Sequence, residues 1–201
     1  MSPVALEPVL SQVVRAREVL AAAFTNDPLM LWLFPEPVGR ADAVAAWLGV
    51  FVEGFAASAV VDTVLDDDGH IAGVALWRLG ATEVQFPAAP TVGGLLVALV
   101  GPEAAVQFGG GLGAFAANKP SPPYHYLQFL AVHPAHQGRG LGRQLVQHGQ
   151  QRAAAAGVGV YLESTNLRNL AFYHSLGLQP AGEFTLQPSG PVAYRLWWQP
   201  S

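Results

Sequence analysis

Two segments near the beginning of the chain carry hydrophobic residues at helical spacing. The first predicted helix ends at Asn26-Asp27-Pro28, and its apolar face carries Leu10, Val13, Val14, Leu20 and Phe24. The second spans about residues 40–57, with an apolar face formed by Val44, Trp47, Leu48, Phe51 and Phe55. Both patterns are typical of helices that pack one face on a core.

The pattern then changes to short β-type runs. Val60–Leu65 and Ile71–Leu79 are joined by Asp66-Asp67-Asp68-Gly69, which predicts a hairpin. Three aspartates in a row are also compatible with a cation site, but Asp-Gly between two strands is the commoner chemistry of a turn. We therefore predict a turn here.

The second half of the chain alternates strands and helices. Strands are predicted at Tyr124–Val132, 158–162, 179–186 and Val192–Trp198, with helices at 140–156, ended by Gly157, and at 169–175. This order predicts one mixed α/β domain over residues 1–201, with a mixed, mostly antiparallel sheet flanked by helices.

A long apolar stretch separates the two halves. Residues 87–117 contain a single charge, Glu103, but prolines and glycines interrupt the run, and its longest uninterrupted piece, 95–100, is far shorter than the ~20 residues of a membrane span. We expect two short buried helices in an insertion over about 86–120. Its sparse charge suggests a cover over an apolar acceptor pocket or the surface of a homodimer, and both stay open.

Composition narrows the classes of function. Hydrophobic residues make up 51% and charged residues 12% of the 201 residues, which excludes intrinsic disorder. The absence of cysteine excludes disulfides, thiolate metal sites and a cysteine nucleophile. A net charge of -4 with only ten Lys and Arg argues against nucleic acid as a partner. The first residues lack the pattern of a signal peptide, so we expect a cytoplasmic protein.

The most informative segment is His133-Pro134-Ala135-His136-Gln137-Gly138-Arg139-Gly140-Leu141-Gly142, between a predicted strand and a predicted helix. Alternating glycines allow close approach of the backbone to a ligand, and the helix that follows presents its positive end. These features predict a phosphate-binding loop.

Three phosphate ligands compete for this loop. A nucleoside triphosphate is disfavoured because Arg143-Gln144 stands where Lys-Ser/Thr would follow the glycines. A dinucleotide site is favoured by Glu163, about 20 residues further on, but Arg143 occupies the third glycine position of that fingerprint. The third ligand is the pyrophosphate of coenzyme A.

At this point the sequence resembles the GNAT superfamily of N-acetyltransferases. Gln137-Gly138-Arg139-Gly140-Leu141-Gly142 is similar to the Gln/Arg-x-x-Gly-x-Gly/Ala signature of that superfamily, and Leu130-Ala131-Val132-His133-Pro134 to the strand end before it. Residues 168–177, Arg-Asn-Leu-Ala-Phe-Tyr-His-Ser-Leu-Gly, are similar to the puromycin N-acetyltransferase-like members. The resemblance implies the acyl-CoA N-acyltransferase fold, with an acetyl-CoA-binding core over about 124–186.

The resemblance also implies roles in binding acetyl-CoA as co-substrate. The pantetheine arm would pair with the strand end at Leu130, Ala131 and Val132, and Asn169 and Phe172 would lie along it. The backbone of the glycine loop would hold the pyrophosphate through Gln137, Gly138, Arg139, Gly140, Leu141, Gly142 and Arg143. The acceptor would be a small-molecule amine, including an antibiotic or an aminonucleoside, with peptide amines as an alternative.

Acetyl transfer to an amine needs a base for the ammonium and an acid for the departing thiolate. The resemblance implies Tyr173 as the acid and favours Glu163 as the base. His125, acting through a water, and a relay of several groups are alternatives. Structural roles compete with these: Tyr173 as a core residue, Glu163 as a partner of Arg168.

No metal is expected, because the pair His133 and His136 has no third ligand in the sequence. The principal alternative function is a catalytically silent acyl-CoA-binding sensor or scaffold, followed by a dinucleotide-dependent oxidoreductase.

Overall fold

A computed structural model describes the whole chain except residues 1, 7–9, 87–90, 122, 188 and 201. One sheet of seven strands, in the order β1-β2-β3-β4-β5-β7-β6, organises it. The strands are β1 (Val4–Ala5), β2 (Val60–Leu65), β3 (Ile71–Leu79), β4 (Tyr124–Val132), β5 (Gly159–Ser164), β6 (Gln179–Thr185) and β7 (Val192–Trp198). Among the described strands only β4 and β5 pair in parallel. The predicted fold class is confirmed.

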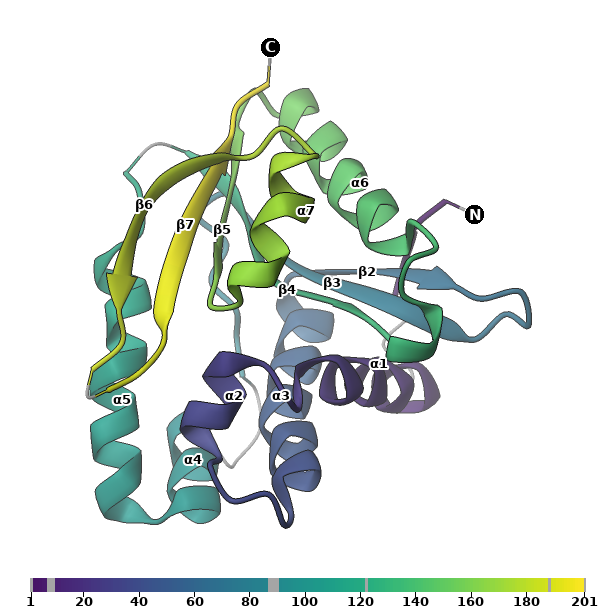
Figure 1. The fold of residues 1–201 in the computed structure, drawn as a ribbon. Helices are drawn as coiled ribbons and strands as arrows, with labels where there is room; N and C mark the ends of the chain where they lie inside the picture. The colour runs from purple at the N-terminus through teal and green to yellow at the C-terminus, as the bar shows by residue number, and fades with distance from the viewer. Residues whose placement is uncertain (1, 7–9, 87–90, 122, 188, 201) are drawn as a thin grey trace.

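Helices cover both faces of this sheet (Figure 1). They are α1 (Leu10–Phe24), α2 (Pro28–Leu33), α3 (Arg40–Ser58), α4 (Val92–Val100), α5 (Pro102–Ala117), α6 (Leu141–Ala155) and α7 (Leu170–His174), with single 3₁₀ turns η1 (Pro134–His136) and η2 (Leu167–Asn169). In Figure 1 the purple and blue helices α1 and α3 lie on the opposite side of the sheet from the green helices α6 and α7.

The core is accordingly divided between the two faces of the sheet. Leu20, Leu48 and Phe55 from α1 and α3 are fully buried in one cluster, and Leu145 and Val146 from α6 belong to the other. These are residues of the predicted apolar faces, so packing follows the periodicity of the sequence.

Helix α6 lies very close to the sheet. A Cβ atom at Gly149 would overlap the indole of Trp77 on β3, so only glycine permits this approach. Arg152 on the same helix donates to both carboxylate oxygens of the buried Asp62 on β2, at 2.8 and 3.0 Å. These two contacts fix the position of α6 and thereby of the loop that precedes it.

Helix α2 was not predicted from the sequence. The predicted end of α1 before Asn26-Asp27-Pro28 is confirmed, but the same residues also begin a helix. The Asp27 carboxylate accepts the N–H of Leu29 at 3.0 Å, and Pro28 occupies the first helical position. Asp-Pro is therefore an N-terminal capping signal here as well as a stop signal. The short strand β1 was also missed.

The insertion forms two helices, as predicted, but they are not buried. Leu96 is the one buried residue of α4, and Ala105 and Gly111 are those of α5. The prediction failed because α4 and α5 pack one face only, and small residues cover much of the other. Residues 87–90 of the predicted segment lie outside the described part of the chain.

Among the described helices, α3 alone is long and apolar enough to cross a membrane by length and composition, with a mean hydropathy of 1.3. Its buried face, however, fills the core described above. Core helices pass the same test, so it is weak evidence for a membrane span.

Candidate active site

Strands β4 and β5 pair only at their beginnings. The parallel register joins Tyr124 to Gly159, His125 to Val160 and Tyr126 to Tyr161, and then the pairing ends. Figure 1 shows the two strands separating beyond this point, with α7 above the opening. A cavity of about 340 Å³ lies there, lined by residues 126–130 of β4 and 162–165 at the end of β5.

The open side of β4 exposes backbone groups. His133 N–H donates to Ala72 O on β3 at 2.8 Å, and residues of a strand alternate in the side to which their backbone groups point. Leu130 and Val132 therefore direct theirs to the open side, where Gln137 Nε2 donates to Val132 O at 3.0 Å. Ala131 pairs with Val74 and is 1% exposed in the core, so it offers no group to this side, contrary to prediction.

The glycine loop between β4 and α6 has the backbone of an anion site. Gly138 and Gly140 adopt φ of 77° and 79°, the left-handed region that favours glycine. Gly140 caps α6 without a side-chain hydrogen bond, so the N–H groups of Leu141, Gly142 and Arg143 have no acceptor within the helix. These N–H groups, at the positive end of α6, can bind a pyrophosphate.

The side chains around the glycine loop differ in exposure and in the groups that they contact. Arg139 is exposed, whereas Arg143 donates to the Ser175 hydroxyl at 3.0 Å and so connects α6 to the end of α7. Phe172 packs beside Gly142, where an added Cβ would lie 3.4 Å from its ring. Asn169 lines the cavity. The structure therefore brings both predicted signatures to one site.

Glu163 lines the cavity from β5. Burial raises the pKa of its carboxyl group, while the hydroxyls of Tyr126 and Tyr161 and the cations Lys119 and Arg195 lower it. Within the described residues, neither carboxylate oxygen accepts a hydrogen bond of ordinary geometry. A buried carboxylate without such a partner is a suitable proton acceptor, and Arg168 is not its ion-pair partner.

Tyr173 is 7% exposed and lines the same cavity from α7. Burial and the nearby charge of Asp27 raise the pKa of its hydroxyl, which therefore stays protonated at neutral pH. Asp27 itself lines the cavity and accepts the Thr165 hydroxyl at 2.9 Å.

The structure does not bring His125 to this cavity. It is 4% exposed, its Nδ1 has no partner among the described residues, and it does not line the cavity. Burial and the nearby Arg152 of α6 lower the pKa of its imidazole. Side chains alternate along a strand, so His125 faces α6 while Tyr126 faces the opposite side.

Sequence reasoning missed much of the acceptor side of the cavity. Its lining includes residues from several elements that are distant in the sequence: Phe24, Met30, Trp47, Phe51, Arg78, Leu112, Phe115 and Lys119. Of the aromatic residues on the predicted apolar faces, Phe24, Trp47 and Phe51 do reach the cavity. The insertion contributes through α4 and α5, and it therefore covers part of the cavity.

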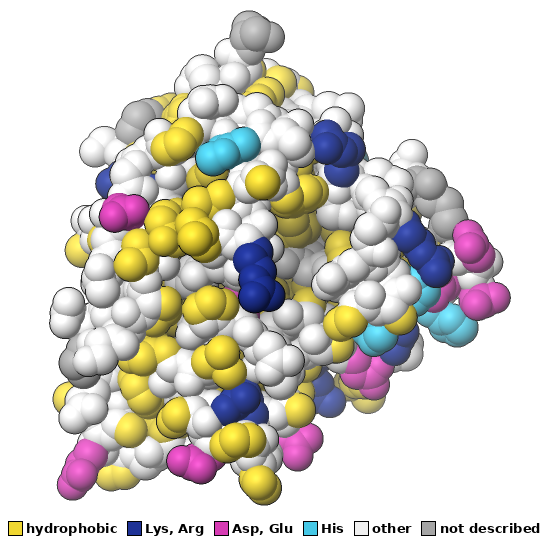
Figure 2. Space-filling model, in the orientation of Figure 1, with side chains coloured by type: hydrophobic (Ala, Val, Ile, Leu, Met, Phe, Trp, Pro, Cys, Tyr) yellow, Lys and Arg dark blue, Asp and Glu magenta, His cyan; other side chains and the backbone are white. Residues whose placement is uncertain are grey.

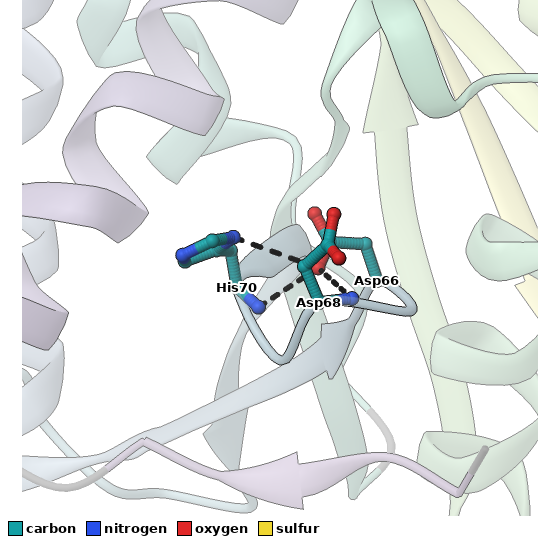
Figure 3. Close-up of side chains that lie close together, drawn as sticks. All are labelled: Asp66, Asp68 and His70. Carbon is teal, nitrogen blue, oxygen red and sulfur yellow. Dashed lines mark hydrogen bonds and ion pairs between the residues drawn. The ribbon is translucent and has the colours of Figure 1, made fainter.

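The aspartate-rich turn between β2 and β3 brings ligand-type groups together in Figure 3. Asp66, Asp68 and His70 have potential ligand atoms within 4.8 Å of one another. However, Asp66 Oδ1 accepts the N–H groups of Asp68 at 3.1 Å and His70 at 2.8 Å. These bonds account for the arrangement as the predicted turn. Figure 2 shows acidic and histidine side chains gathered at that edge of the molecule.

A mixed sheet with a diverging parallel pair, followed by a glycine loop and a helix N-terminus, defines a protein of the acyl-CoA transferase class. The model of the acetyltransferase (GNAT) family matches residues 24–178, well over half of the chain. The chain belongs to this family and is an acetyl-CoA-dependent N-acetyltransferase.

Solved structures agree with this assignment. A histone acetyltransferase HPA2 and related acetyltransferase from Corynebacterium glutamicum is 28% identical, with a TM-score of 0.74, and the match covers 100% of this chain and 98% of that one. The C-terminal condensation domain of Ebony, in complex with beta-alanyl-dopamine, is 15% identical (TM-score 0.62, 99% and 98% covered). Drosophila melanogaster polyamine N-acetyltransferase is 16% identical (TM-score 0.56, 99% and 100% covered). The last two support the fold alone.

Proposed function

We propose that this chain transfers the acetyl group of acetyl-CoA directly to the primary amine of a small molecule. One observation carries the proposal: Glu163 and Tyr173 line the same cavity, which opens along the unpaired side of β4. A base, an acid and a surface for an extended ligand thus converge at one point.

Acetyl-CoA would bind across the opening between the two strands. The N–H groups of the glycine loop and of Leu141, Gly142 and Arg143 would hold its pyrophosphate. Leu130 and Val132 would pair with the pantetheine arm as an added strand would. Asn169 and Phe172, beside the loop and the cavity, would flank that arm.

The chemistry follows from the two groups in the cavity. Glu163, directly or through a water, would accept a proton from the ammonium of the acceptor. The free amine would attack the thioester carbonyl, forming the C–N bond as the C–S bond breaks. Tyr173 would give its proton to the departing thiolate and recover one from the nitrogen, which loses its second proton as the amide forms. No covalent enzyme intermediate is required, which agrees with a chain that has no cysteine.

The cavity favours an acceptor with an apolar body. Trp47 and Phe51 line it from α3, and Leu112 and Phe115 line it from α5. An antibiotic or an aminonucleoside, suggested by the resemblance of residues 168–177 to puromycin N-acetyltransferase-like members, belongs to this proposal. The small size of the cavity favours such molecules over a protein amine.

The test is an amine panel. Purified protein is given acetyl-CoA with alkyl amines, aralkyl amines, amino acids, puromycin and a lysine peptide, and release of thiol is followed. We expect amine-dependent release with at least one small amine. Tight binding of acetyl-CoA with no turnover on any amine would contradict the proposal and favour the catalytically silent module.

A further inference from the structure

Two cations line the cavity beside its aromatic residues. Arg78 comes from the end of β3, and Lys119 follows helix α5 at the end of the insertion. Both are half-buried. Within the described residues neither forms an ion pair with a carboxylate, and Arg78 Nε is buried without a hydrogen-bond partner.

The two cations meet at the ring of Tyr126. Lys119 Nζ lies 4.3 Å from the ring centroid, and the Arg78 guanidinium carbon lies 5.7 Å from it. Burial and the positive charge of Arg78 lower the pKa of Lys119, whereas the negative charge of Glu163 raises it. Two like charges held together in a low-dielectric cavity attract an anion strongly.

A structural role alone accounts poorly for this pair. Arg78 lies over the rings of both Phe55 and Tyr126, at 5.9 and 5.7 Å, but Lys119 shares the Tyr126 ring with it and the two positive charges repel each other. Buried charges in proteins are ordinarily paired. Glu163 interacts electrostatically with Lys119, but no described carboxylate forms an ion pair with either cation, and a ligand that carries a negative charge would supply this direct partner.

The order of residues along β4 relates the two cations to Glu163, the proposed base. The parallel pairing ends at Tyr126 and Tyr161, and two positions further along each strand Gln128 and Glu163 both line the cavity. Gln128 lines the cavity, and its Oε1 is buried without a partner among the described residues. Two positions of an extended strand, about 6–7 Å, separate Tyr126, which both cations contact, from Gln128. Leu130 lies as far again in the direction of the glycine loop.

We propose that the acceptor is a small amino carboxylate with an apolar side chain, whose carboxylate binds Arg78 and Lys119 while its amine lies between Glu163 and Gln128. This inference rests on the proposed function and names the substrate class of the same site. A separation of about 6–7 Å is what a short amino acid spans together with its hydrogen bonds at both ends. The aromatic and leucine lining receives the side chain.

The first experiment compares matched acceptors. Phenylalanine, tryptophan and leucine are tested against their decarboxylated amines (phenethylamine, tryptamine and isopentylamine) and against phenylalanine amide, with thiol release as the measure. We expect kcat/KM for the best amino acid to exceed that of its amine and its amide by about 10- to 100-fold, the usual effect of a charge-assisted pair.

The outcomes separate this inference from the proposed function. Equal or faster acetylation of the decarboxylated amines overturns the inference that the substrate carries a carboxylate, while the N-acetyltransferase assignment stands. Turnover of puromycin or the lysine peptide, with none of the amino acids, does the same. Failure of every amine in the panel contradicts the proposed function itself.

The second experiment removes the cations. Lys119→Gln and Arg78→Gln should each lower the ratio of kcat/KM for the amino acid to kcat/KM for its decarboxylated amine by about 10-fold or more. The ratio between the two substrates is the readout, because any effect of Lys119 on the base is common to both. Arg168→Gln, which removes an exposed charge outside the cavity lining, should leave the ratio unchanged. A constant ratio in both cavity variants overturns the inference.

Discussion

The coenzyme side and the acceptor side of the cavity are built in different ways. Most of the coenzyme side belongs to one continuous segment, the end of β4, the glycine loop and the first turn of α6, and that segment offers mainly backbone N–H groups. The acceptor side is assembled from side chains of α1, α2, α3, β3 and the insertion. The first can bind the same ligand in many proteins, whereas the second can change its specificity through single substitutions.

Tyr173 lies where the two sides meet, and its substitution should have the largest effect. Tyr173→Phe should lower kcat by roughly 10²- to 10⁴-fold, because the acid for the departing thiolate is lost. Affinity for acetyl-CoA, measured by calorimetry, should change little. Tyr194→Phe, a half-buried tyrosine of β7 outside the cavity lining, is the control. Wild-type turnover in Tyr173→Phe would remove this residue from the mechanism.

Glu163→Gln should lower kcat/KM by roughly 10²-fold and change the pH profile. Burial raises the pKa of Glu163, so wild-type activity should fall as the pH drops through that raised value, and the variant should lack this acidic limb. Because folding raises this pKa, ionisation of Glu163 opposes folding. Wild-type stability should therefore decline as the pH rises through it, and the variant should not show that decline.

The matched control for this variant is Glu183→Gln, an exposed carboxylate on β6. Rate and stability are measured between about pH 4 and 9, a range that brackets the ordinary and the raised pKa of a carboxyl group. Superimposable pH–rate profiles of wild type and Glu163→Gln would transfer the role of base to water.

A change in the glycine loop should affect the coenzyme side alone. Gly140 has φ of 79°, which a β-branched residue adopts only with strain, although an added Cβ would meet no atom within 4 Å. Gly140→Val should weaken acetyl-CoA binding by roughly 5- to 150-fold, since the strain of about 1–3 kcal/mol is relieved by moving the loop. KM for the amine should be nearly constant. Retained tight binding would refute the loop as the pyrophosphate site.

The smallest expected effect concerns stability on the acceptor side. Gly113 is exposed within α5, and an added Cβ would contact no atom within 4 Å. Gly113→Ala should stabilise the protein by about 1 kcal/mol and raise its melting temperature by about 2–4 °C. At Gly111, one half-turn earlier, a Cβ would overlap the Trp32 ring and the Gln187 carbonyl, so Gly111→Ala should destabilise. Identical melting temperatures of Gly113→Ala and Gly111→Ala would contradict the described packing of α5.

The same contrast explains what could be predicted from sequence. The glycine loop and residues 168–177 form continuous motifs, and strands β2, β3, β4 and β7 have the predicted bounds because alternation and turn residues define them locally. The ends of β5, β6 and α7 differ from their predicted bounds by one or two residues, as helix and strand ends commonly do.

The acceptor side left no such local signal. Arg78 and Lys119 are 41 positions apart and come together only through the pairing of β3 with β4. His125 was predicted beside the cavity because it lies on the correct strand, but the alternation of the strand directs it to α6. A single residue of register decides which face a side chain occupies, and residue type alone does not fix it.

The early end of pairing between β4 and β5 gives the protein an edge strand in the middle of its sheet. Natural sheets shield their outer edges, because unpaired backbone groups add foreign strands. Here the unpaired backbone groups of β4 need partners that can leave. Water would bind them when the site is empty, and the coenzyme would bind them during turnover. Acetyl-CoA would then act as a missing eighth strand, so its binding should slow hydrogen exchange at Leu130 and Val132 and make the folded state more resistant to heat.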